Sequence, residues 1–230
     1  MRLLSQTIAG HFGAWSCGSC RQRQELPICL GCRHASGMNT VPRIARLGAW
    51  PLLFAASYWD RRRIPVPSTV ATCLLRFKHA GDRYAGRCLA SAFGAMLAAF
   101  DLRVSAVVAI PPSPERARAR ALDPAAWLAR SVAHHSSLRF RSDLLVRCRA
   151  APTQRGLGGI HRRQNVVGAF SARDRLADGN PVLLIDDVCT TGSTLSEAAR
   201  VLEAAGATVH LAVLACADAD ICRQCPSRID

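Results

Sequence analysis

The hydrophobic positions of the second half of the chain fall into short continuous apolar runs separated by segments of helical period. Apolar runs at residues 104–110, 144–146, 182–185 and 209–214 predict strands, and the run at 182–185 reads as buried on both faces. Strands that alternate with helices favour a parallel sheet. The pattern therefore predicts an α/β fold in which helices flank a parallel sheet.

The helical segments carry recognisable start and stop signals. Residues 69–100 predict two helices separated by a turn at Ala80, Gly81 and Asp82. Residues 124–133 predict a helix with Asp123 as its N-cap and proline at its first position. A further helix is predicted from Leu195 to about Ala205.

The strand predicted at 182–185 leads into two adjacent carboxylates, Asp186 and Asp187. We expect the strand to end at Asp186, because charges do not continue into a buried sheet. The turn that follows offers small side chains, hydroxyl groups and free N–H groups at a helix N-terminus, which suits a phosphate. Its residues are Thr190, Thr191, Gly192, Ser193 and Thr194.

Two acids beside a phosphate cradle suit a ligand that also carries hydroxyl groups, such as a ribose 5-phosphate. In this interpretation the strand end holds the sugar and the turn holds its phosphate. The alternative is an ordinary strand–turn–helix connection, in which Asp and Thr serve only as cap residues.

The end of the strand predicted at 104–110 offers a second group of anion-binding candidates. It runs into the rigid turn Pro111, Pro112 and Ser113, and a strand end next to such a turn could present backbone N–H groups to a pyrophosphate. Arginines 116, 118 and 120 follow and could add positive charge. The alternative is a strand that ends at prolines and leads into an exposed basic helix.

A long glycine-rich and basic segment lies between residues 149 and 168. Long loops of this kind are often mobile lids that close over an active site. Closure would bring Arg155, Arg162 or Arg163 to a leaving pyrophosphate and exclude water. The alternative is a disordered surface loop.

Composition narrows the class of protein. The 230 residues are 50% hydrophobic, enough for one sizeable globular core, and no apolar stretch is long enough to span a bilayer. No signal peptide is evident, so we expect a cytoplasmic protein. The net charge of +14 suggests anionic partners, but 29 of the 30 basic residues are arginine, a skew that also fits a GC-rich genome. The single lysine is Lys78.

Four cysteines near the N-terminus have the spacing of a zinc knuckle. Cys17 and Cys20 form one Cys-x-x-Cys pair, and Cys29 and Cys32 form another after eight residues. Two such pairs suit a tetrahedral four-thiolate zinc site, whereas disulfides are disfavoured in a reducing compartment. We therefore predict a structural zinc ion held by these four thiolates.

The other cysteines carry weaker expectations. Five lie in apolar surroundings and are interpreted as small core residues: Cys73, Cys88, Cys148, Cys189 and Cys216. Cys189 is an exception among them, because it is expected to lie inside the phosphate turn. The pair Cys222 and Cys225 cannot complete a four-thiolate site alone, and we interpret it as idle.

These patterns divide the chain into three parts. Residues 1–40 are predicted to form the four-cysteine zinc knuckle, which cannot build an apolar core of its own. Residues 41–68, rich in proline and arginine, are interpreted as a linker. Residues 69–230 are predicted to form the α/β domain.

The chain resembles a known family over nearly its whole length. Residues 181–195 resemble the PRPP-binding motif of type I phosphoribosyltransferases, a hydrophobic strand followed by two acids and T-T-G-x-T. The chain also resembles the ComF/GntX-like family of competence-linked phosphoribosyltransferase homologues. This resemblance rests on the motif together with the cysteine quartet, residues 75–82, the proline turn and residues 154–170. Lys78 falls where that family typically has lysine. A role for this lysine at the pyrophosphate and an ordinary solvated lysine both remain open.

The resemblance implies a type I phosphoribosyltransferase-like fold that binds PRPP with Mg²⁺. It implies that Asp186 and Asp187 hold the ribose hydroxyls in catalysis and that residues 190–194 bind the 5-phosphate. The implied physiological role is the handling of incoming single-stranded DNA in natural transformation, with competence helicase or recombination proteins as further candidate partners.

One departure from the family leaves the activity open. After the proline turn the family reads Arg-Gly-Phe-Asn-Gln, whereas this chain has Arg120-Ala121-Leu122-Asp123-Pro124. The usual Pro-x-Pro is also reduced to Pro111, with Ala109 at the earlier position. Three functions are therefore weighed: a phosphoribosyltransferase, a non-catalytic DNA-binding adaptor that uses PRPP as a regulatory ligand, and a base-salvage phosphoribosyltransferase.

Overall fold

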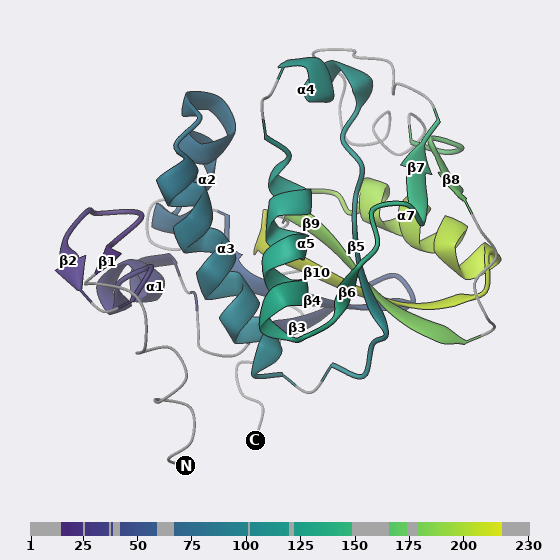
Figure 1. Cartoon of the computed structure of the whole chain (residues 1–230), viewed down its shortest axis with the longest axis horizontal. Helices are drawn as coiled ribbons and strands as arrows, with labels where there is room; N and C mark the ends of the chain where they lie inside the picture. The colour runs from purple at the N-terminus through teal and green to yellow at the C-terminus, as the bar shows by residue number, and fades with distance from the viewer. Residues whose placement is uncertain are drawn as a thin grey trace.

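The central feature of the fold is a six-stranded sheet (Figure 1). The computed structural model describes residues 15–24, 26–36, 38, 42–58, 67–100, 102–119, 122–148, 166–173 and 179–217. Across the sheet the strand order is β3-β4-β10-β9-β5-β6, and only the β3–β4 pairing is antiparallel. The strands are β3 (Arg43–Leu47), β4 (Trp50–Ser57), β5 (Ala106–Ala109), β6 (Arg139–Phe140), β9 (Asn180–Cys189) and β10 (Ala207–Cys216).

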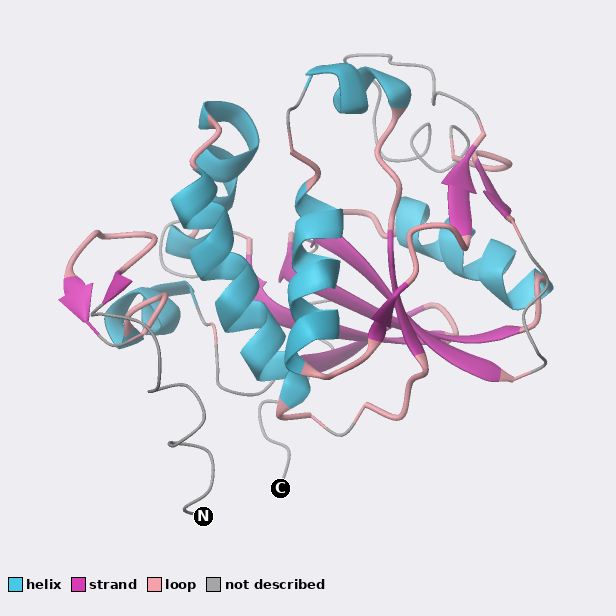
Figure 2. Cartoon of the chain, in the orientation of Figure 1, coloured by secondary structure: helices cyan, strands magenta, loops and turns pink. Residues whose placement is uncertain are grey.

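Helices cover both faces of this sheet (Figure 2). Helices α2 (Thr69–Ala80), α3 (Arg83–Ala98) and α5 (Pro124–His135) cover one face, and α7 (Ser193–Ala204) covers the other. Side chains along β9 therefore alternate between two hydrophobic clusters, one on each face of the sheet. Leu183 and Ile185 join the first cluster, under α2, α3 and α5, and Leu184 joins the second, under α7. The predicted α/β fold, with parallel strands flanked by helices, is confirmed.

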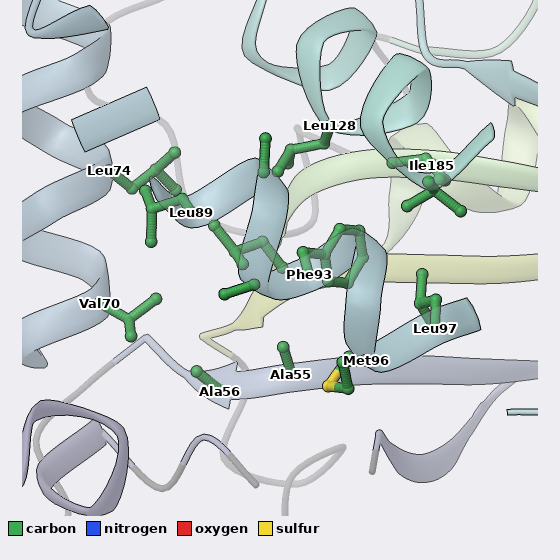
Figure 3. Close-up of a cluster of buried hydrophobic side chains, with 14 of the residues drawn as sticks. Ala55, Ala56, Val70, Leu74, Leu89, Phe93, Met96, Leu97, Leu128 and Ile185 are labelled. Carbon is green, nitrogen blue, oxygen red and sulfur yellow. The ribbon is translucent and has the colours of Figure 1, made fainter. Parts of the chain in front are cut away.

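The first cluster shows how tightly the helices meet the sheet. Phe93 and Leu97 of α3 and Leu128 of α5 are buried with Ile185 of β9 (Figure 3). A close approach of α2 and α3 depends on a glycine, because a Cβ built on Gly86 would lie 2.4 Å from the ring of Phe77. These contacts fix α2 against the rest of the domain.

The helix boundaries follow the signals in the sequence. Gly81 ends α2 in the left-handed conformation at φ 65°, and the Asp82 carboxylate accepts a hydrogen bond from the Ala85 N–H to cap α3. Asp123 caps α5 in the same way, accepting from the Ala125 N–H with proline at the first helical position. The predictions for these helices are confirmed.

The interpretation of residues 41–68 as a linker is wrong for residues 43–57. This stretch forms β3 and β4, and β4 pairs in parallel with β10 from Leu52 to Ser57. The apolar run around Leu52 and Phe54 is completely buried, which a linker would not require. Proline is tolerated because Pro51 lies at the second position of β4, near its start.

Smaller elements complete the described chain. Strands β1 (Trp15–Ser16) and β2 (Arg23–Gln24) and helix α1 (Leu30–Ser36) form the N-terminal knuckle, and α4 (Pro114–Ala119) follows β5. Strand β8 (Phe170–Ala172) pairs antiparallel with β7 (Leu145–Arg147) and lies beside α7.

Candidate functional site

The acidic pair lies where the connections of the sheet diverge. Strand β9 is flanked by β5 on one side and β10 on the other. From β5 the chain proceeds to β6, whereas from β9 it proceeds through α7 to β10, in the opposite direction across the sheet. Ligands of open α/β sheets bind in the crevice outside the carboxyl ends of the strands at such a switch point. The fold therefore marks the ends of β5 and β9 as the candidate site.

The prediction that the strand stops at Asp186 is wrong. Strand β9 continues to Cys189, and its last residues Val188 and Cys189 stay paired with β10. The two charges are tolerated because the strand is less buried at this edge of the sheet. Asp186, Asp187 and Val188 are only partly buried. A lysine from α2 also reaches this strand end. Both carboxylates thus lie on the sheet itself rather than on a loop beyond it.

Asp186 has an unusual protonation equilibrium. Burial and the neighbouring Asp187 charge raise the pKa of the Asp186 carboxyl to about 7, against smaller opposite effects of Lys78 and Arg116. One carboxylate oxygen accepts the backbone N–H of Asp187 at 2.7 Å. A carboxyl group whose pKa lies near physiological pH is typical of functional sites, where the protonation state is adapted to binding or catalysis.

This shift predicts a pH-dependent stability that Asp186→Asn removes. Because the folded-state pKa lies above the ordinary value of 3.8, ionisation destabilises the folded protein as pH rises from about 4 to about 7. We expect D186N to match the wild type below pH 4 and to exceed its free energy of unfolding above pH 7, by an amount on the order of 1 kcal/mol or more. Urea denaturation at a series of pH values measures the difference. A constant difference across that range would contradict the assignment.

Asp187 is paired with the single lysine of the chain. The Lys78 Nζ atom lies 2.7 Å from the Asp187 carboxylate, and the two side chains are only 13% and 15% exposed. The interpretation of Lys78 as a solvated lysine is therefore wrong. Burial and the Asp187 charge both raise the pKa of the phenol of Tyr58, the residue that follows β4. The pairing joins α2 to the end of β9.

The hydroxyl-rich turn forms the connection from β9 to α7. Gly192 precedes the first residue of α7 at φ 73°, a left-handed conformation that favours glycine, and its carbonyl accepts the Ser196 N–H. The hydroxyls of Thr191 and Ser193 lie 2.9 Å apart. No side chain caps α7. Thr190 is exposed and Thr194 is half-buried. The predicted turn therefore lies at the N-terminus of a 12-residue helix, beside the acidic pair.

The proline turn lies beside Asp186. Ala109 of β5 pairs with Ile185, and the Ile110 N–H donates to the Ile185 carbonyl at 2.9 Å. Pro111, Pro112 and Ser113 follow directly, all partly buried. The register therefore brings this turn to the same edge of the sheet as the acids.

Arg147 is a site residue that the sequence reasoning missed. Strand β7 carries it, its guanidinium stacks on Phe170 of β8 at 4.4 Å, and its Nε–H donates to the Pro111 carbonyl at 3.3 Å. Burial and the nearby Arg116 lower the pKa of Arg147, while Asp186 opposes this shift. The only sequence signal was one more arginine in an arginine-rich chain. The pairing of β7 with β8 is what directs it to the site.

Several predicted residues lie outside the described part of the chain. These are the lid arginines Arg155, Arg162 and Arg163, together with Arg120 of the basic run and the cysteine pair Cys222 and Cys225. Their assignments remain predictions.

The four cysteines of the knuckle converge. The Sγ atoms of Cys17, Cys20, Cys29 and Cys32 all lie within 4.8 Å of one another. The Cys20 and Cys29 sulfurs are 3.7 Å apart, close to the edge of about 3.8 Å expected for a tetrahedron with Zn–S bonds of about 2.3 Å. Such a separation is far beyond the length of a disulfide bond, and all four are free thiols. The cluster is compatible with structural zinc.

Backbone donors support this ligand set. The Cys29 N–H donates to the Cys17 sulfur at 3.4 Å, and the Cys32 N–H donates to the Cys29 sulfur at 3.3 Å. Although burial opposes ionisation, N–H groups of Cys29, Cys20 and Ser19 lower the pKa of the Cys17 thiol to about 6. Because zinc binds thiolates rather than thiols, these donors favour the metal-binding form.

The remaining described cysteines follow the prediction with one exception. Cys73, Cys88, Cys189 and Cys216 are buried, whereas Cys148 is exposed because the chain has left β7 at that point. Cys189 is the last residue of β9 and packs in the cluster beneath α7, so its thiol does not belong to the phosphate turn.

Part of the chain is similar in sequence to known proteins. Residues 156–228 match the family described as phosphoribosyl transferase domain. Competence protein F of Haemophilus influenzae is 32% identical over 103 residues, which are 44% of this chain and 45% of that protein. The DNA utilization protein YhgH of Salmonella typhi is 32% identical over 101 residues, 44% of each chain. The chain is similar to both proteins over this stretch. The resemblance to the ComF/GntX-like family is thereby confirmed, although the match covers less than half the length of each relative.

Solved structures with partial similarity include an adenine phosphoribosyltransferase and a PRPP amidotransferase. Adenine phosphoribosyltransferase from Leishmania donovani covers 88% of this chain and is itself covered to 87%, with a TM-score of 0.42 and 11% identity. Glutamine PRPP amidotransferase from B. subtilis has a TM-score of 0.38 and 23% identity over 54% of this chain and 26% of that one. Because these TM-scores and identities are low, the fold assignment rests on the strand order of the six-stranded sheet. Among the described residues, no helix has the length and apolar character needed to cross a membrane.

Proposed function

We propose that this protein binds PRPP at the carboxyl ends of β5 and β9. The observation that carries the proposal is the placement of Asp186, Asp187 and the turn 190–194 at the switch point of the sheet. Carboxylates accept hydrogen bonds from ribose hydroxyls, and N–H groups at the start of α7 suit the 5-phosphate. The match of residues 156–228 to the phosphoribosyl transferase domain supports the same ligand class.

The pyrophosphate of PRPP requires positive charge, which this edge of the sheet can supply. Arg147 is within reach of the proline turn, and Arg116 is close enough to influence the pKa of both Arg147 and Asp186. We propose that these residues and the turn Pro111–Ser113, through the N–H and hydroxyl of Ser113, bind the pyrophosphate, and that Arg155, Arg162 and Arg163 close over it. Mg²⁺ held on the pyrophosphate oxygens would supply further neutralisation of the leaving group.

Two roles are compatible with this site. In a transferase, a nucleophile attacks the anomeric carbon of the ribose, the bond to pyrophosphate breaks, and the carboxylates stabilise the positive charge that develops on the sugar. In an adaptor, PRPP serves as a regulatory ligand without transfer. The departure at residues 120–124 favours the adaptor, whereas the complete acidic pair and turn favour the enzyme.

The wider role proposed is the handling of DNA, with single-stranded DNA as the partner. It is supported by the names of the relatives, a DNA utilization protein and a competence protein, and by the net charge of +14. A cytoplasmic location is proposed as well, because all described cysteines are free thiols, as in a reducing compartment.

Calorimetric titration with PRPP and Mg²⁺ tests the ligand assignment. We expect one PRPP per chain, and we expect Arg147→Met to weaken binding about tenfold, because it removes a hydrogen-bonding charge worth about 1.5 kcal/mol. Arg130→Met, an arginine on α5 that stacks on Phe140, is the matched control and should bind normally. No heat of binding to the wild type would defeat the proposal.

A second measurement separates the enzyme from the adaptor. Release of pyrophosphate in the presence of free bases or single-stranded DNA would establish transfer. Binding of PRPP without release for any acceptor, together with salt-dependent binding of single-stranded DNA, would establish the adaptor.

A further inference from the structure

Helix α2 lies between the cysteine knuckle and the acidic pair. Three of its residues face the knuckle, and their spacing of four and three places them on one side of the helix: Thr69, Cys73 and Arg76. The Thr69 carbonyl accepts the Ser19 hydroxyl at 3.4 Å, and the Cys73 thiol donates to the Gly18 carbonyl at 3.3 Å. The knuckle therefore covers the outer side of α2 along its length.

Lys78 lies on the opposite side of the same helix. It is two positions from Arg76, which corresponds to about 200° of rotation in a helix of 3.6 residues per turn. The Lys78 ammonium contacts Asp187 at 2.7 Å. A rigid helix thus has the knuckle on one side and the candidate ligand site on the other.

Arg76 fixes the end of α2 through two sets of contacts. One guanidinium nitrogen donates to the carbonyls of Gly18 and Ser19 in the knuckle, at 3.4 and 3.3 Å. The other donates to the Asp82 carboxylate, which also accepts Arg21 of the knuckle. The second oxygen of Asp82 caps α3 through Ala85, so Asp82 joins the knuckle, α2 and α3. The last turn of α2 has little freedom to rotate or shift.

We infer that Arg76 is a positioning residue that, through Asp82 and the knuckle carbonyls, holds Lys78 against Asp187. The Asp187 charge is thereby neutralised before any ligand arrives, which lowers the repulsion toward an anionic phosphate ester. The consequence for ligand binding rests on the proposed function. The positioning of Lys78 does not, and is tested separately.

Lys78 is the only lysine of the chain, so the labelling rate of its amine can be measured without interference from other lysine side chains. We propose to measure acylation of the Lys78 amine by an N-hydroxysuccinimide ester, with peptide mapping to separate it from the α-amino group. We expect Arg76→Met to raise the labelling rate about threefold, and Asp187→Asn to raise it further by removing the partner directly. Arg87→Met, an exposed arginine of α3, is the matched control and should label at the wild-type rate. An unchanged rate in R76M, or in D187N, would overturn the inference.

A double-mutant cycle with Mg²⁺ and PRPP tests the effect on the ligand. We expect Lys78→Met to weaken binding about tenfold and R76M about threefold, with the double variant no weaker than K78M, because Arg76 acts through Lys78. Additive losses would show that Arg76 acts independently of Lys78 and would overturn its positioning role. If the wild type binds no PRPP, the proposed function fails, while the labelling rates still decide whether Arg76 positions Lys78.

Discussion

Replacing Asp186 and Asp187 together by Asn is expected to lower the affinity for Mg²⁺-PRPP by at least about a hundredfold. Each carboxylate is proposed to accept a hydroxyl of the ribose, and a hydrogen bond to a charged group contributes about 1.5–3 kcal/mol, so two lost interactions amount to 3 kcal/mol or more. Asn keeps the size of Asp and one acceptor oxygen, so the loss reports the charge. Isothermal titration calorimetry on both proteins measures it.

The control for this experiment lies at the far end of α7. Glu203 accepts the Trp50 indole N–H at 2.7 Å, a hydrogen bond that Glu203→Gln can retain. This variant also removes one acidic charge but should bind PRPP like the wild type. Equal affinity in the wild type and the double Asn variant would show that the ligand, if it binds, lies elsewhere. Two opposite effects on the melting temperature are expected, since the loss of Asp186 removes a destabilising charge above pH 7, whereas the loss of Asp187 leaves the Lys78 ammonium without its partner.

Replacing Cys29 by Ser is expected to remove the zinc ion and to lower the free energy of unfolding by several kcal/mol. Cys29 is buried, and its sulfur adjoins that of Cys20 and accepts the Cys32 N–H. Structural zinc contributes directly to folding free energy, and a serine hydroxyl is a poor substitute for a thiolate. Metal analysis by mass spectrometry and denaturation in guanidinium chloride measure the two effects, with about one zinc per chain expected in the wild type.

A buried cysteine outside the cluster provides the matched control. Cys189 is 1% exposed and lies at the end of β9, so Cys189→Ser makes the same chemical change in a similarly buried place. It should retain the full zinc content. Wild-type protein with substantially less than one zinc per chain, or a C29S variant that keeps its metal, would contradict a zinc role for the knuckle.

The elements that could be predicted from the sequence are those with strong local signals. The caps at Asp82 and Asp123 mark helix starts because their carboxylates bond to the following N–H groups. The run at 182–185 predicts a strand because a sheet covered on both faces requires a continuous apolar stretch. The close packing of Cys17, Cys20, Cys29 and Cys32 likewise follows from their paired spacing.

The elements that were missed depend on contacts between distant parts of the chain. Proline and arginine around residues 41–68 suggested a linker, but pairing with β10 outweighs that local preference in β4. Asp186 extends the strand because Lys78 of α2 and the ladder to β10 support its end. Arg147 reaches the site only because β7 pairs with β8. No local spacing in the sequence encodes these long-range pairings.

The pairing of β4 with β10 has a consequence for how this protein can be divided. Strand β10 is buried over nearly its whole length, and β4 covers the edge from Leu211 to Cys216. A fragment that begins at Thr69 would expose this apolar edge with its unpaired backbone groups. Such an edge recruits strands from other molecules, so the fragment would self-associate and aggregate. Work on the isolated α/β domain should therefore retain β3 and β4.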